Sequence, residues 1–230
     1  MNGRTGEIIA LGTFALVLLS AAGQARAQDA NELYPSMAPI AQYRMDRDAE
    51  IALARTAAPA SISRDAKVLV LGQKNFETAV QGKNGFVCMV GRAFGGPLTN
   101  PEFWNPKNRS PICLNPPAAR SLLPYAIKQT GMALAGASKA QITDAIRTAV
   151  ARKELGPPES GSMAYMMSKE AYLTDQGSHN LAHVMFELPR NGVFQDNPNF
   201  FVSWDPAPVI EFNVPVGEWS DGTLVTVSKH

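Results

Sequence analysis

The succession of helical and strand patterns is the sequence feature that most constrains this fold. Three segments repeat apolar residues at helical spacing, and each has helix start and stop signals at its ends. Short β-branched or alternating runs surround them, at residues 67–71, 76–81, 86–92, 163–168, 183–188, 209–214 and 223–228. This order predicts an α+β domain, in which a mainly antiparallel sheet of about five to seven strands packs against three helices.

The ends of the expected helices follow from local chemistry. The segment Pro39–Ala58 has a helical apolar stripe, and a second helix should follow Asn115 and bend at Pro124. Ser138 and Gln141 have the spacing of a capping box, which predicts the start of the third helix.

Two irregular segments separate the patterned ones. Phe94–Pro117 and Asn191–Pro208 are rich in proline and aromatic residues, which predicts ordered loops packed on the sheet rather than disordered linkers. Between the second and third expected strands, Asn84-Gly85 is a typical hairpin turn, so we expect these two strands to pair.

The first 27 residues have the pattern of a secretory signal. Arg4 precedes an apolar run of 12 residues, Ile8–Leu19, and Ala25-Arg26-Ala27 matches a cleavage site. Cleavage after Ala22 and an uncleaved membrane anchor are the alternatives. We expect a mature single domain, residues 28–230, that is soluble, lacks an integral membrane segment, and is periplasmic or secreted.

Charge and cysteine content support this expectation. The chain has 21 Lys and Arg against 20 Asp and Glu, and this balance predicts no binding to nucleic acid. Cys88 and Cys113 are the two cysteines, and both follow the signal segment. An oxidising compartment would let them form a disulfide, and two free buried thiols are the alternative.

Four segments, PEFWNPKNRSPIC, NPPAARS, GSMAYMMS and HVMF, resemble those of an uncharacterised family of exported bacterial proteins. No activity, substrate or cofactor is attached to that family. The resemblance therefore implies export and nothing more specific.

A candidate chemical site lies between the two strands expected within Gly161–Arg190. His179 and His183 are four residues apart, so they could share a metal ion only if the chain turns between them. Asp175 and Glu187 are the natural additional ligands, and zinc or copper would suit the site. The spacing lacks the glutamate of H-E-x-x-H, and a solvated or structural histidine pair is the alternative.

Two classes of function remain from the sequence. The first is non-catalytic binding of a small molecule or a protein, in a pocket between the sheet and the two irregular loops, lined by Trp104 and Trp204. The second is a metal-dependent or acid–base enzyme that uses His179 and His183. The chain has no G-x-S-x-G, C-x-x-C, P-loop or G-x-G-x-x-G motif to favour a particular enzyme class.

Overall fold

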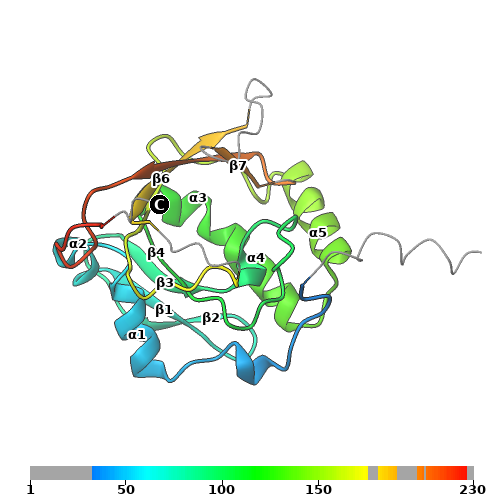
Figure 1. The fold of residues 1–230 in the computed structure, drawn as a ribbon. Helices are drawn as coiled ribbons and strands as arrows, with labels where there is room; N and C mark the ends of the chain where they lie inside the picture. The colour runs from blue at the N-terminus through cyan, green and yellow to red at the C-terminus, as the bar shows by residue number, and fades with distance from the viewer. Residues whose placement is uncertain (1–32, 176–180, 191–200, 205, 227–230) are drawn as a thin grey trace, which may run out of the picture. The chain divides into compact units, whose positions relative to one another are not determined.

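One sheet runs through the part of the chain that the structure describes. The computed structural model describes residues 33–175, 181–190, 201–204 and 206–226, which belong to one compact unit, Glu32–His230. Eight strands lie in these ranges in the order β2-β1-β3-β4-β5-β6-β8-β7 (Figure 1). They are β1 (Lys67–Leu71), β2 (Phe76–Val80), β3 (Val87–Gly91), β4 (Ser110–Leu114), β5 (Met163–Met166), β6 (His183–Pro189), β7 (Phe201–Ser203) and β8 (Val209–Pro215).

All neighbouring strands are antiparallel except β1 and β3, which are parallel. The α+β class with a mainly antiparallel sheet is therefore confirmed. The predicted signal segment, residues 1–27, lies outside the described ranges.

The expected hairpin at Asn84-Gly85 is wrong. β2 pairs with β1 instead, through the turn in which Gly72 N–H donates to the Asn75 carbonyl at 2.8 Å, and β3 takes the other edge of β1. Gly85 does adopt a positive φ of 78°, as the sequence indicated. The side chain of Asn84, however, donates to the Ile62 carbonyl at 2.8 Å and ties this turn to a neighbouring helix.

Two strands lie in segments that were expected to be irregular. β4 falls within Phe94–Pro117 and pairs with both β3 and β5, and β7 falls within Asn191–Pro208 and pairs with β8. At the chain's end, an isolated bridge joins Glu218 and Leu224 where a last strand was expected.

The helices fall into two groups along the chain. The first is α1 (Arg47–Arg55) and α2 (Ala60–Ser63); the second is α3 (Pro116–Ser121), α4 (Leu123–Leu134) and α5 (Lys139–Ala151). Short 3-10 turns occur at Ile40–Gln42 and Ala93–Gly95. The bend expected at Pro124 is a break between α3 and α4, and Ser138 and Gln141 form the expected capping box of α5.

The two groups cover opposite faces of the first half of the sheet. Residues of α1 pack on Val68, Cys88 and Val90, whose side chains lie on one face. Leu69 and Met89 lie on the other face and pack on α4. Figure 1 shows α3 and α4 between this half of the sheet and β6. The second half of the sheet, from β5 to β8, therefore faces α3 and α4.

A disulfide joins Cys88 and Cys113, as the sequence predicted. The two residues stand directly opposite each other on β3 and β4, and both are fully buried beneath α1. Within the described ranges, no helix is long and apolar enough to cross a membrane.

Candidate functional site

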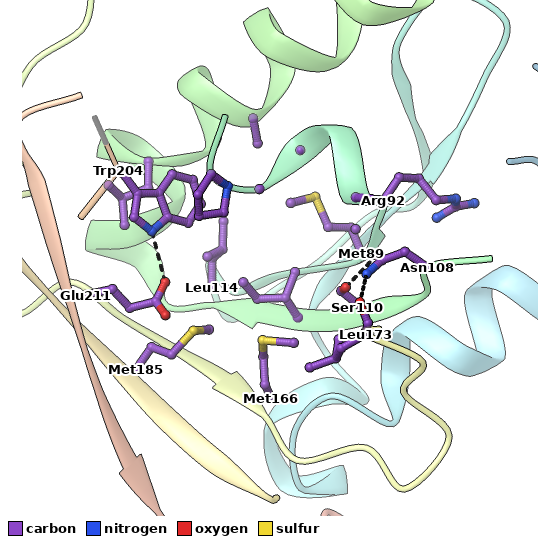
Figure 2. Close-up of a pocket in the computed structure, with 18 of the residues that line it drawn as sticks. Met89, Arg92, Asn108, Ser110, Leu114, Met166, Leu173, Met185, Trp204 and Glu211 are labelled. Atoms are coloured by element: carbon purple, nitrogen blue, oxygen red, sulfur yellow. Dashed lines mark hydrogen bonds between the residues drawn. The ribbon is translucent and has the colours of Figure 1, made fainter. Parts of the chain in front are cut away.

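A cavity of about 660 Å³ lies on the face of the sheet that packs on α4. Residues from six strands and from α4 line it, together with the turn after β3 and Trp204 after β7. Most of the lining is apolar, including Met89, Leu114, Met166 and Met185, which Figure 2 shows around one space. The size and the apolar lining are those of a pocket for a small organic molecule.

Strand β6 has its polar residues on the cavity side. His183, Met185 and Glu187 alternate along the strand and all line the cavity. The alternate residues of the strand point to the opposite face, on which Phe186 and Leu188 are each 40% exposed. A strand of this sequence would ordinarily bury the phenylalanine and leucine. The reversed orientation places a glutamate in the interior.

Glu187 stands directly opposite Glu211 of the neighbouring strand β8. Side chains at such a pair are about 5 Å apart at their Cβ atoms, and both of these line the cavity. Glu187 is 4% exposed and Glu211 is 8% exposed. The indole Nε1–H of Trp204 donates to Glu211 Oε2 at 3.1 Å, as Figure 2 shows. Two neighbouring carboxyl groups are thus held at one end of an apolar cavity.

The environment of this pair disfavours two negative charges. Burial raises the pKa of Glu187 well above its ordinary value, and repulsion from Glu211 raises it further. Burial also raises the pKa of Glu211, and hydrogen bonds from Asn213 and Trp204 oppose that rise. Two such carboxyl groups lose their protons in steps that belong to the pair.

Two hydrogen-bond acceptors without donors lie at this end of the cavity, one in the pair and one beside it. Glu187 Oε2 and Asn213 Oδ1 are buried and have no hydrogen-bond partner among the described residues. Asn213 also lines the cavity, two residues beyond Glu211 on the same face of β8. Buried acceptors without a donor are rare in folded proteins and call for an explanation.

His183 lies at the other end of β6. Its Nδ1 is 2.7 Å from the Leu181 carbonyl, and burial lowers the pKa of its imidazole. Four residues of strand separate it from Glu187, which corresponds to about 13 Å. The imidazole and the carboxyl group therefore line one cavity without forming a dyad.

The remaining polar side chains of the lining already have partners. Arg92 turns its guanidinium toward the buried Glu50, with Nη2 to Oε1 at 3.0 Å. Asn108 donates to the Leu173 carbonyl at 2.8 Å and accepts from Ser110 Oγ at 2.8 Å. These contacts support the wall of the cavity, and they leave the Glu187–Glu211 end as its most polar unsatisfied part.

The described members of the predicted metal set lie apart. Asp175 accepts hydrogen bonds from Tyr34, Tyr172 and Lys107, which occupy its carboxylate oxygens. His183 and Glu187 line the cavity at different points. His179 lies outside the described residues. Within the described ranges, no group of three or more His, Cys, Asp or Glu side chains could hold a metal ion, so zinc or copper binding stays a prediction.

The two predicted binding tryptophans have different positions. Trp204 lines the cavity, as expected. Trp104 is 5% exposed, packs edge-on against Phe103 in the core, and is not among the residues that line the cavity.

Sequence reasoning missed Glu211 as a site residue. The segment Val209–Val214 alternates, so that Glu211 and Asn213 share one face of the strand. That alternation signals a polar face on β8. It does not identify Glu187 as the partner, because the pairing of β6 with β8 depends on register.

Comparisons with protein-family models, with curated proteins and with solved structures find no match to this chain.

Proposed function

We propose that this domain is an exported binding protein that holds a small, mainly apolar molecule in the cavity. The observation that carries the proposal is the 660 Å³ apolar space with a buried polar end. Apolar side chains are stabilised by close packing contacts with other apolar atoms. A ligand would supply them.

Export rests on the signal pattern at residues 1–27 and has support from the disulfide. Structural disulfides persist in oxidising compartments, such as the bacterial periplasm or the extracellular medium. The bond between Cys88 and Cys113 is consistent with such a location for the mature domain.

Octan-1-ol tests whether the cavity binds apolar molecules at all. A ligand that binds only the folded state raises the unfolding temperature, by an amount that grows with the logarithm of its concentration once that exceeds the Kd. We expect octan-1-ol, or its amine or carboxylate analogue, to raise the unfolding temperature of the protein progressively with its concentration. The substitution Ala126→Phe fills part of the cavity from α4 and should abolish that shift.

Ala140→Phe is the matched control, because Ala140 is an exposed residue of α5. It should leave the shift unchanged. The proposal is contradicted if none of the three octyl compounds binds, or if Ala126→Phe binds them as well as the wild type.

A catalytic function is the second candidate, and the Glu187–Glu211 pair favours it. A carboxyl group whose pKa is raised by burial can act as a general acid near neutral pH. Mass analysis of a bound compound after prolonged incubation distinguishes the two functions. Binding predicts recovery of the unchanged compound, whereas an enzyme would convert it to a product.

A further inference from the structure

The polar end of the cavity is rich in hydrogen-bond acceptors. Glu187 Oε2 and Asn213 Oδ1 are buried without partners among the described residues, and Glu211 accepts hydrogen bonds from the side chains of Trp204 and Asn213. An acceptor removed from water and left without a donor opposes folding. A ligand that brings donors to this end would satisfy it.

The described protein supplies no cation here. No salt bridge in the described ranges reaches Glu187 or Glu211. Arg92 lines the cavity but is held by Glu50 and by the Tyr43 carbonyl, to which its Nε donates at 2.6 Å. A buried carboxylate is stabilised by a positive charge close to it, so the complement of this end is a cation with several N–H donors.

We propose that the ligand is an apolar amine, whose protonated amino group binds between Glu187 and Glu211 while its hydrocarbon part fills the cavity. This inference rests on the proposed function and specifies its ligand class. A primary ammonium group has three donors. They match the two carboxyl groups and the Asn213 carbonyl oxygen in number and in kind.

Other ligand chemistries fit this end less well. A fatty carboxylate would place a third carboxyl group beside two, which charge repulsion disfavours. An alcohol has a single donor and no charge. A calcium ion takes six to eight oxygen ligands, whereas two carboxyl groups and one amide provide fewer.

Amine binding should depend on pH in a definite direction. The groups that face the site are Glu187 on β6, Glu211 and Asn213 on β8, and Trp204; His183 and Arg92 line more distant parts of the cavity. In acid, both carboxyl groups are protonated and cannot neutralise an ammonium ion. Binding should therefore strengthen as pH rises through the titration of the pair, with release of a proton.

Titration calorimetry with three compounds of equal chain length tests the inference: octylamine, octan-1-ol and octanoate. We expect octylamine to bind at least about tenfold more tightly than octan-1-ol near pH 7, as charge-assisted hydrogen bonds are the stronger kind. Octanoate should bind most weakly. Glu187→Gln and Glu211→Gln keep the side-chain shape and should each remove most of the amine preference, with octan-1-ol binding retained.

Glu170→Gln is the control, because Glu170 is an exposed glutamate away from the cavity. It should keep the full preference for octylamine. Equal or tighter binding of octan-1-ol or octanoate overturns the amine inference and leaves the proposed function in place. A preference that survives both glutamine variants, or that requires added zinc or calcium, also overturns the inference. If no octyl compound binds, the proposed function itself fails.

Discussion

Glu187 and Glu211 are the residues at which local sequence preference and the fold disagree. Each lies in a strand of apolar residues, and each turns its carboxyl group inward. Desolvation of a carboxylate opposes folding unless a partner compensates for it. Residues that oppose folding in this way are common at binding and catalytic sites, where they serve a ligand rather than the fold.

The free protein should therefore lose stability as pH rises above the ordinary glutamate pKa. A carboxyl group whose pKa is raised in the folded state stabilises the fold fully below its unfolded value of 4.5, and this contribution is lost as pH rises through the folded value. Glu187→Gln cannot ionise. We expect it to match the wild type near pH 4 and to exceed its free energy of unfolding at pH 8, as measured by urea denaturation.

Other carboxylates, which are present in both the wild type and Glu187→Gln, stabilise the fold less as pH falls. The pKa of Glu159 is lowered by Arg120, so its contribution falls in acid. The difference between wild type and variant removes that common part. A constant difference across this pH range would show that Glu187 keeps an ordinary pKa.

At the scale of elements, β1 explains the order of the sheet. Its residues after Lys67 are all buried, which is typical of a strand with neighbours on both edges. The sequence KVLVL carried that signal, whereas the Asn84-Gly85 turn indicated only a local positive φ. Local turn chemistry cannot decide which strand edge the chain takes next, and for that reason the predicted hairpin was wrong.

The disulfide links β3 and β4, two paired strands that a long segment of chain separates. Cys88 and Cys113 close a loop of 25 residues between β3 and β4, which includes the turn that lines one side of the cavity. Replacing both cysteines by alanine should lower the free energy of unfolding by about 3 kcal/mol, since the cross-link restricts the unfolded chain. Urea denaturation of the oxidised wild type and of the double variant measures this difference.

Ser138, the exposed N-cap residue of α5, provides a reference for the size of this loss in the free energy of unfolding. Ser138→Ala removes the hydrogen bond to the Gln141 N–H and should cost about 1 kcal/mol. If the double cysteine variant loses less than the cap variant, the disulfide contributes little to the stability of the fold.

At the scale of the whole molecule, the sequence predicted classes of structure better than it predicted neighbours. The α+β class, the disulfide and the alternation of His183, Met185 and Glu187 followed from periodicity and from cysteine chemistry. The cavity did not, because it forms where strands from residue 76 to residue 215 meet α4. Register and long-range pairing create that space, and neither is encoded in a local pattern.

The methionines allow the central claim, a ligand in the cavity, to be tested directly. Met89, Met166 and Met185 line the cavity, whereas Met45 packs beside α1 and Met163 lies on β5 with its side chain away from the lining. Methyl NMR of protein labelled with ¹³C at methionine resolves these positions separately. Titration with octylamine should shift the three cavity methyl signals saturably and leave those of Met45 and Met163 in place. Unchanged cavity signals, or equal shifts at all five methionines, would contradict ligand binding in the cavity.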